Sequence, residues 1–157
     1  MEAELTDVER TFVLLKPDAL QRSLVGEILA RFERRGFRIL ALRILQPHRE
    51  LAERHYEVHR GKFFFEGLVD HLISGPVVAM VLEGENVIQA VRTMVGSTIP
   101  HEAASGTIRG DLAIAGLRNL VHASDAPETA KQEISLYFKD ADISQYQRDI
   151  DRWVFEE

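Results

Sequence analysis

The sequence predicts an α/β or α+β domain in which strands and helices follow a split β-α-β-β-α-β order. Short apolar runs with the length of buried strands alternate with segments whose apolar residues recur at helical spacing. Glycine or proline stands at most of the boundaries between these segments. Because the chain has no repeat and no Gly/Ser linker, we expect residues 1–157 to form one domain, a four-stranded antiparallel sheet covered by helices on one face.

The first half of the chain supplies two of the expected strands. Residues 11–16 are apolar enough for a buried strand, and from Leu24 the spacing becomes helical up to Gly36, which favours a helix end. Residues 37–45 suit a strand or a helix by composition, and their place after a glycine-ended helix favours a strand. Two short helical patterns follow, separated by a glycine: 49–58 and 64–73.

The second half repeats the alternation around one long connection. Residues 97–118 show little periodicity, and a connection of that length in a compact domain is often functional. Asp125 and Glu128 have the spacing of a capping box at the start of the last helix. The expected elements are, in order, a strand, a helix, a strand and a helix: 77–83, 85–95, 119–122 and 126–138.

Composition and charge narrow the possible functions. The chain has no cysteine, which excludes disulfides, thiolate catalysis and cysteine-bound metals. Its start is acidic, and its longest purely apolar stretch, 77–82, is too short for a bilayer, so we expect a cytoplasmic protein without a membrane partner. Residues 10–62 carry 12 Lys/Arg against 6 Asp/Glu. Such a basic half can attract the phosphates of nucleic acid or of a nucleotide, although arginines scattered over solvated helix faces are the more common explanation for most of these residues.

His122 is the leading candidate for catalysis. It stands where a short strand meets the start of a helix, a position that favours anions such as phosphate. A carboxylate such as that of Glu133 could bind one ring nitrogen and leave the other as a nucleophile. A lone histidine is more often structural, so the residues around it leave both interpretations open.

Three further segments could bind a nucleotide. Arg109 lies between two glycines, where backbone can approach a phosphate closely, although a surface turn would look the same. Lys16 ends a strand, a frequent place for active-site residues and also for ordinary edge lysines. One of the three aromatics at 63–65 could stack on a base or lie in a subunit contact. No Walker A or G-x-G-x-x-G pattern is present.

Taken together, these segments resemble nucleoside diphosphate kinases from about Arg10 to Phe155. The most specific piece is N-x-x-H-x-S-D at 119–125, followed by a glutamate in EIS. The other matching pieces stand in the family's order: RTFVLLKPD, LVGEILARFERRGF, HY, FFEGLV, SGPVVAMV, GSTIP, GTIRGD, EISLYF and WVFE. The resemblance implies a ferredoxin-like sandwich and a homo-oligomer, tetrameric or hexameric.

The resemblance also implies ping-pong phosphate transfer without any need for nucleic acid. His122 would take the terminal phosphate of a nucleoside triphosphate and pass it to a nucleoside diphosphate. Glu133 would orient His122, Ser124 would support Glu133, and Asp125 would touch the water shell of a Mg²⁺ ion carried by the nucleotide. The remaining implied site residues would contact phosphates (Arg92, Thr98, Arg109), the sugar and phosphate side (Lys16, Asn119), the histidine (Tyr56), the base (Phe64, Leu68) and another subunit (Pro100).

The chain departs from the family pattern at positions that perform no chemistry. Gly116 and Leu117 reverse a valine–glycine pair whose valine contacts the base, which puts the second wall of the base pocket in question. The other departures replace a usual glycine or proline: Ala19, Phe63, Ser105 and Ala123. Three rival functions remain at this point, namely a nucleic-acid-binding module, an inactive scaffold and a hydrolase in which the histidine activates water.

Overall fold

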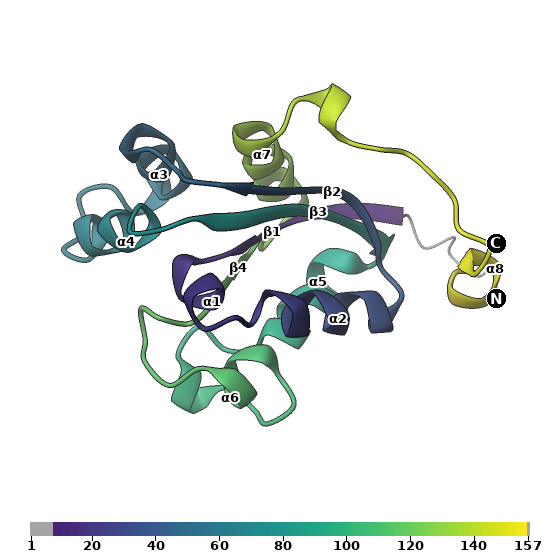
Figure 1. Ribbon diagram of the computed structural model, residues 1–157, viewed down its shortest axis with the longest axis horizontal. Coiled ribbons are helices and arrows are strands. Elements are labelled where there is room, and N and C mark those ends of the chain that lie inside the picture. Colours follow the sequence, from purple (N-terminus) through teal and green to yellow (C-terminus); the bar gives the residue numbers. More distant parts are fainter. Residues whose placement is uncertain (1–7, 157) are drawn as a thin grey trace.

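Four strands form a single antiparallel sheet in the order β2-β3-β1-β4 (Figure 1). The structure is a computed structural model that describes residues 8–156. The strands are β1 (Val8–Leu15), β2 (Arg38–Leu45), β3 (Val77–Glu85) and β4 (Val121–Ala123). The α+β class and the split strand order predicted from the sequence are therefore confirmed.

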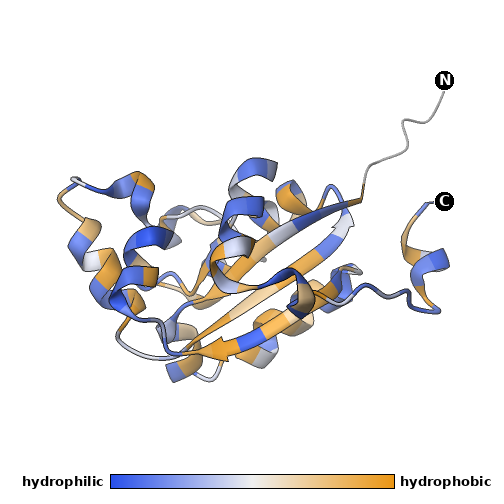
Figure 2. Ribbon diagram, turned by 90° about the horizontal axis from the view of Figure 1, so that it is seen from above, coloured by the Kyte–Doolittle hydropathy of each residue, from blue (hydrophilic) through white to orange (hydrophobic). Residues whose placement is uncertain are grey.

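Helices cover both faces of the sheet, so the expectation of cover on one face is wrong (Figure 1). The cause lies in β1, where four consecutive side chains, 12–15, are fully buried. Because neighbouring side chains of a strand point to opposite faces, each face of β1 presents two apolar groups that need cover. The hydropathy view shows the same apolar strands inside polar outer helix faces (Figure 2).

Each face has its own set of helices and its own apolar core. One core joins the sheet to α1 (Pro17–Gln21), α2 (Val25–Arg35), α5 (Val87–Val95) and α6 (Ile108–Leu112). The other joins it to α3 (Arg49–His55), α4 (Phe65–Leu72) and α7 (Pro127–Tyr137). Short elements complete the chain: η1 (Glu57–His59), η2 (Pro100–Glu102), η3 (Asp140–Asp142) and α8 (Asp151–Val154).

Most helix boundaries agree with the sequence, and one predicted cap does not form. Gly36 ends α2 in the left-handed conformation with φ 107°, as its position predicts. The capping box of Asp125 and Glu128 is wrong, because the residue that precedes α7 is Ala126, which makes no side-chain cap. Pro127 fixes the first helical residue one position later than the box requires. The sequence patterns also missed three short helices: α1, α6 and α8.

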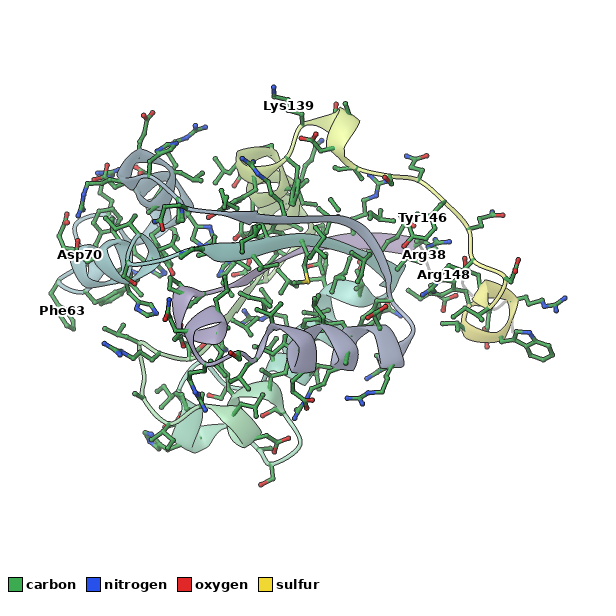
Figure 3. All side chains as sticks on the ribbon, in the orientation of Figure 1. Arg38, Phe63, Asp70, Lys139, Tyr146 and Arg148 are labelled. Carbon is green, nitrogen blue, oxygen red and sulfur yellow. The ribbon has the colours of Figure 1, made fainter. Side chains whose placement is uncertain are left out.

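The C-terminal segment is pinned beside the start of β2. Arg148 donates hydrogen bonds to the carbonyl oxygens of Gly36 (2.7 Å) and Phe37 (3.2 Å). Asp151 accepts from both Arg148 and Arg38, and these two arginines lie beside α8 in Figure 3. Among residues 8–156, no helix has the length and apolar character needed to cross a membrane.

Two glycines provide a matched test of packing in this fold. A Cβ atom added to Gly110 in α6 would lie 1.9 Å from the carbonyl oxygen of Ala104, whereas one added to Gly26 in α2 would meet no atom within 4 Å. We expect Gly110→Ala to lower the free energy of unfolding by about 1–3 kcal/mol through overpacking. We expect Gly26→Ala to raise it by about 0.5–1 kcal/mol, because the unfolded chain has less conformational entropy to lose with alanine than with glycine. Urea unfolding measures both, and equal stability of the two variants would contradict this account.

Candidate active site

One large cleft gathers nearly all the residues that the sequence singles out. Its volume is about 1140 Å³, and its walls come from the strand ends, α3, α4, α7 and the long connection 97–118. Eleven of the predicted site residues line it: Lys16, Tyr56, Phe64, Leu68, Arg92, Thr98, Arg109, Asn119, His122, Asp125 and Glu133. The twelfth, Ser124, is fully buried behind the cleft wall.

The alternation of β4 decides where His122 points. Val121 and Ala123, on either side of it, belong to the core on the face of α2 and α5. His122, paired with Leu14 of β1, therefore points to the opposite face, where α3 and α7 lie. Three consecutive residues of a short strand thus place one imidazole in the cleft.

A hydrogen-bonded chain behind His122 fixes its ring. Nε2 of His122 bonds a carboxylate oxygen of Glu133, which is 5% exposed and comes from α7. The other carboxylate oxygen of Glu133 accepts a hydrogen bond from the hydroxyl of Ser124 at 3.0 Å. A carboxylate that accepts from Nε2 selects the tautomer with its proton there, so Nδ1 keeps its lone pair.

The surroundings of His122 keep its ring neutral. Burial, then the charges of Lys16, Arg109 and Arg92, lower the pKa of His122 well below its usual range. Burial also raises the pKa of Glu133, although its neighbours partly offset that effect. A neutral imidazole among fixed cations is a nucleophile suited to an anionic electrophile.

Backbone carbonyl groups hold the guanidinium of Arg109 in place. Its guanidinium donates to three backbone carbonyl oxygens, those of Asn119 (3.2 Å), Gly96 (3.0 Å) and Val121 (2.5 Å). Burial lowers its pKa to about 10, so it remains charged at neutral pH. Neither Arg109 nor Arg92 forms a salt bridge with a carboxylate among the described residues, and Arg92 donates to the carbonyl oxygen of Ala123 at 3.2 Å. Both charges therefore remain available to an anion.

Lys16 connects the end of β1 to the long connection. Its ammonium group, 6% exposed, donates to the side-chain oxygen of Asn119 at 2.8 Å. The amide nitrogen of Asn119 in turn donates to the carbonyl oxygen of Thr98 at 3.0 Å. Burial and the nearby charge of Arg109 lower the pKa of Lys16 to about 8. These polar groups lie in one cleft although the chain separates them widely.

The outer part of the cleft is apolar. Phe65 is a core residue, Phe63 is 98% exposed and points away from the molecule in Figure 3, and Phe64 lies between them at the cleft. Leu68 lines the same wall. Leu117 faces it, with its Cδ1 atom 4.0 Å from the position that a Cβ of Gly67 would take. The reversed Gly116–Leu117 pair thus still places an apolar side chain in the lining of the cleft that also contains Phe64.

The sequence patterns gave no separate signal for His55 and no role for Leu117. His55 is buried at the end of α3, beside His122. It could have been noticed as the histidine of the HY pair, but a pair of two residues is too short to predict a contact. Leu117 was visible only as a departure from the family pattern.

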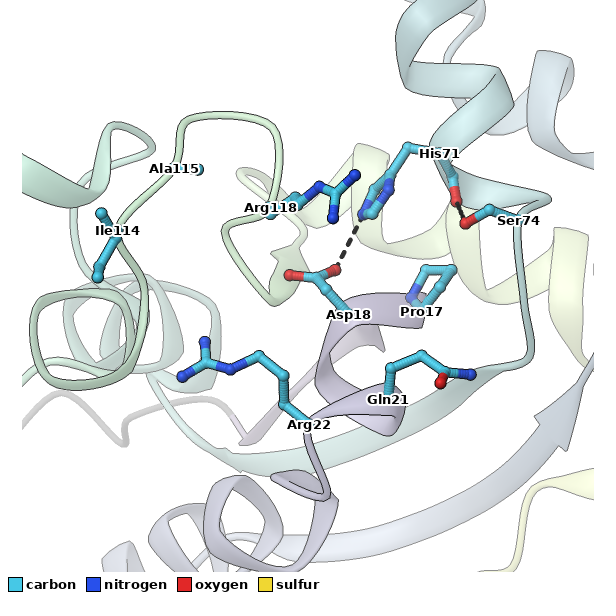
Figure 4. Close-up of a pocket in the computed structure, with 9 residues that line it drawn as sticks. All are labelled: Pro17, Asp18, Gln21, Arg22, His71, Ser74, Ile114, Ala115 and Arg118. Carbon is cyan, nitrogen blue, oxygen red and sulfur yellow. Dashed lines mark hydrogen bonds and ion pairs between the residues drawn. The ribbon is translucent and has the colours of Figure 1, made fainter.

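A second, smaller pocket of about 390 Å³ lies beside α1, and it contains a partly buried hydrogen bond between Asp18 and His71 (Figure 4). Asp18 accepts from Nε2 of His71 at 2.9 Å and from the backbone N–H of Leu120 at 3.0 Å. Burial alone would raise the pKa of Asp18, but the hydrogen bond and charge of His71 lower it overall. Leu120 has φ 73°, a conformation that a leucine rarely adopts. Asp18 therefore stabilises the strained turn that leads into β4 and His122.

A neutral imidazole ringed by fixed cations at the end of a sheet defines a phosphoryl-transfer site. Comparisons with known proteins match most of the chain. The sequence model of the nucleoside diphosphate kinase family covers residues 9–143. A nucleoside diphosphate kinase of Archaeoglobus fulgidus is 55% identical over 150 residues, which are 96% of this chain and 99% of that protein. One of Synechocystis is 50% identical over 95% of this chain and its own full length.

Solved structures agree with the sequence comparisons. The nucleoside diphosphate kinase of Halobacterium salinarum, solved in complex with CDP, superposes with a TM-score of 0.93 at 42% identity and covers 96% of this chain and all of that one. The chain therefore belongs to the nucleoside diphosphate kinase family. It is a phosphotransferase that moves the terminal phosphate of a nucleoside triphosphate to a nucleoside diphosphate, and the ping-pong mechanism through a phosphohistidine is general in this family.

The hydrogen bond from Leu120 to Asp18 predicts that the stability of the protein depends on pH. We expect Asp18→Asn to lower the free energy of unfolding by about 1–3 kcal/mol at pH 7, because buried donors lose a charged acceptor. The folded-state pKa of Asp18 is depressed, so this stabilisation is present above the unfolded pKa, about 4, and is lost as pH falls through the folded value. Urea unfolding at several pH values should show that the difference in the free energy of unfolding between Asp18→Asn and wild type becomes smaller below pH 4. Asp149→Asn, at an exposed aspartate, is the control, and a difference that persists at pH 2 would refute the assignment.

Proposed function

We propose that Nδ1 of His122 is the atom that carries the phosphate between the two nucleotides. The hydrogen bond from Nε2 of His122 to Glu133 is the observation that supports this choice. This hydrogen bond places the ring proton on Nε2. Nδ1 then has no hydrogen-bond partner among residues 8–156 and keeps its lone pair. The hydroxyl of Ser124 keeps the carboxylate of Glu133 in position for that bond.

The proposed phosphate transfer consists of two steps that mirror each other. The Nδ1 lone pair of His122 attacks the terminal phosphorus, the bond to the bridging oxygen breaks, and the departing nucleoside diphosphate takes that electron pair. Positive charge develops on the imidazole and is opposed by the carboxylate of Glu133. A second nucleoside diphosphate then attacks the same phosphorus with its terminal oxygen. The phosphorus–nitrogen bond breaks, and its electrons return to Nδ1.

The cations of the cleft are the proposed phosphate ligands. Arg92 and Arg109 carry charges that backbone carbonyls fix in place and that no described carboxylate neutralises. Thr98 is proposed to bind phosphate with these two arginines, and Lys16 and Asn119 are proposed to contact the sugar hydroxyl and the phosphates. Because these groups are already oriented, they stabilise the spread negative charge of the transition state without reorganising. Loss of one such donor typically costs about 10²-fold in turnover.

The nucleobase is proposed to lie between Phe64 and Leu117, with Leu68 behind it. These side chains form the apolar mouth of the cleft. Stacking on an aromatic ring does not depend on which base is present, so broad nucleotide use follows. The Halobacterium relative was solved in complex with CDP, which supports nucleotide binding by this chain. Tyr56 is 7% exposed and lines the inner wall near the imidazole, where it is proposed to position the transferring phosphate.

Magnesium is proposed to enter with the nucleotide. Among the described residues the cleft has three acidic side chains. Glu57 is paired with Arg60, and Glu133 is engaged with His122 and Ser124. This leaves the exposed Asp125 to meet the water shell of a Mg²⁺ ion held by phosphate oxygens. When bound, the ion neutralises phosphate charge.

The working unit is proposed to be a cytoplasmic homo-oligomer, tetrameric or hexameric, of single-domain chains spanning residues 1–157. Leu42 and Ile44 are 52% and 67% exposed on β2, an edge strand of the sheet. Ile114, in the long connection, is 90% exposed. Exposed apolar groups on an edge strand favour self-association. No membrane and no nucleic acid is required.

Labelling tests the nucleophile directly. Incubated with γ-labelled ATP and Mg²⁺ but no acceptor, the wild type should form an acid-labile, base-stable phosphoprotein that discharges to any added nucleoside diphosphate. His122→Ala should take up no label, because the nucleophile is gone. His48→Ala, at an exposed histidine outside the cleft, should label normally. Label retained by His122→Ala would refute the assignment, and release of free phosphate without transfer would indicate hydrolysis.

The two neighbouring phenylalanines separate stacking from a surface effect. Phe64→Ala should weaken binding of all nucleoside diphosphates alike by about 1–3 kcal/mol, the usual contribution of one stacked base. Phe63→Ala should leave binding unchanged, because that side chain is 98% exposed and does not line the cleft. Titration calorimetry with four different bases measures both. A loss confined to one base, or an equal loss in Phe63→Ala, would contradict the stacking role.

A further inference from the structure

His55 is a buried imidazole in contact with the nucleophile, and the transfer scheme above gives it no part. It ends α3 and is 7% exposed. Its ring centroid lies 4.5 Å from that of His122, with the ring planes at 74°. An edge of one ring therefore meets the face of the other, an arrangement that restricts rotation of both. Glu133 holds His122 only at Nε2, so a second contact is needed to fix the ring plane.

His55 is itself held by the helix that carries Glu133. The hydroxyl of Tyr137 lies 3.2 Å from Nδ1 of His55. Tyr137 follows Glu133 by four residues in α7, so both side chains lie on the same face of that helix. The other ring nitrogen of His55, Nε2, is buried without a hydrogen-bond partner among residues 8–156. A buried polar atom left unpaired costs stability, and such sites are often functional.

His55 is neutral, and a neutral ring is compatible with the positive charge that develops on His122 during attack. Burial, followed by the neighbouring His122, lowers the pKa of His55 well below its usual value, so the ring is neutral. A positive charge here would add to those of Lys16 and Arg109 and would oppose the charge that forms on His122 during attack. A neutral ring of His55 can pack against His122 without this charge repulsion.

A metal site is the competing use of the same groups. One ring nitrogen of His55, one of His122 and a carboxylate oxygen of Glu133 lie within 4.8 Å of one another. Two imidazoles and a carboxylate can bind zinc. However, Lys16, Arg92 and Arg109 place three positive charges around these donors and lower the pKa of His122. That field disfavours a divalent cation and favours a supporting role for His55.

We propose that His55 is a positioning residue for phosphate transfer. Its ring, anchored to α7 through Tyr137, holds the imidazole of His122 in the rotation that keeps Nε2 on Glu133 and Nδ1 toward the nucleotide. The proposal rests on the proposed role of His122 as phosphate carrier. It predicts that His55 affects the rate of the chemical step and not the affinity for nucleotide, because His55 acts on the nucleophile alone.

The test measures single-turnover phosphorylation by saturating Mg²⁺–ATP. In His55→Ala the rate should fall about 100-fold, the usual cost of a misplaced reactive group, while the Kd for ADP stays within about twofold. Nitrogen NMR of labelled histidine should show a smaller population of the Nε2–H tautomer of His122. The double variant His55→Phe/Tyr137→Phe keeps both rings and leaves no hydroxyl unpaired, so it should recover most of the rate.

A matched control separates positioning from weakening of α3. The side chain of His48 caps the other end of this helix by accepting a hydrogen bond from the backbone N–H of Leu51 at 3.1 Å, and His48 does not line the cleft. His48→Ala should weaken the helix but leave the phosphorylation rate unchanged. The proposal is overturned if His55→Ala reacts at the wild-type rate, if His48→Ala is equally slow, or if the ring-preserving double variant is as slow as His55→Ala. Failure of wild type to label would instead refute the role of His122.

Discussion

The buried carboxylate of Glu133 is the constraint on which the site depends. It is satisfied by two donors, the hydroxyl of Ser124 and Nε2 of His122, and both come from the segment that contains β4. A carboxylate in a buried place must be hydrogen-bonded to remain stable there. The same bonds that satisfy it select the tautomer of the imidazole. One set of contacts between α7 and the segment of β4 therefore both stabilises the buried carboxylate and orients the imidazole.

The cations of the cleft are held by uncharged groups. Arg109 is surrounded by carbonyl oxygens, which orient its guanidinium but neutralise little of its charge. Lys16 is buried against the neutral amide of Asn119. Positive groups that lie close together and form no salt bridge with the described carboxylates repel one another and destabilise the folded chain. That cost is consistent with a site built for a highly charged anion, because a bound nucleotide supplies the missing negative charge.

Positions that contribute no reacting group still determine the geometry. Asp18 lies outside the cleft, yet it holds Leu120 in a strained conformation immediately before the strand that carries His122. Gly110 allows α6 to approach Ala104 closely and so places Arg109. The long connection 97–118 is ordered by such contacts, including a bond from the hydroxyl of Thr107 to Ala104 at 2.6 Å. Function therefore extends into residues that a search for reactive side chains would pass over.

The amino-acid sequence was sufficient to predict the four strands, the longer helices between them, the left-handed helix end at Gly36 and most of the residues that meet in the cleft. These features depend on local patterns and on motifs that can be read along the chain. Tertiary structure decided the cover on both sheet faces, the start of α7 after Ala126, the contact of His55 with His122 and the place of Leu117 in the lining of the cleft. Each of these rests on side chains from segments distant in sequence. Periodicity shows that a residue is buried, but only the packed fold shows which residue it is buried against.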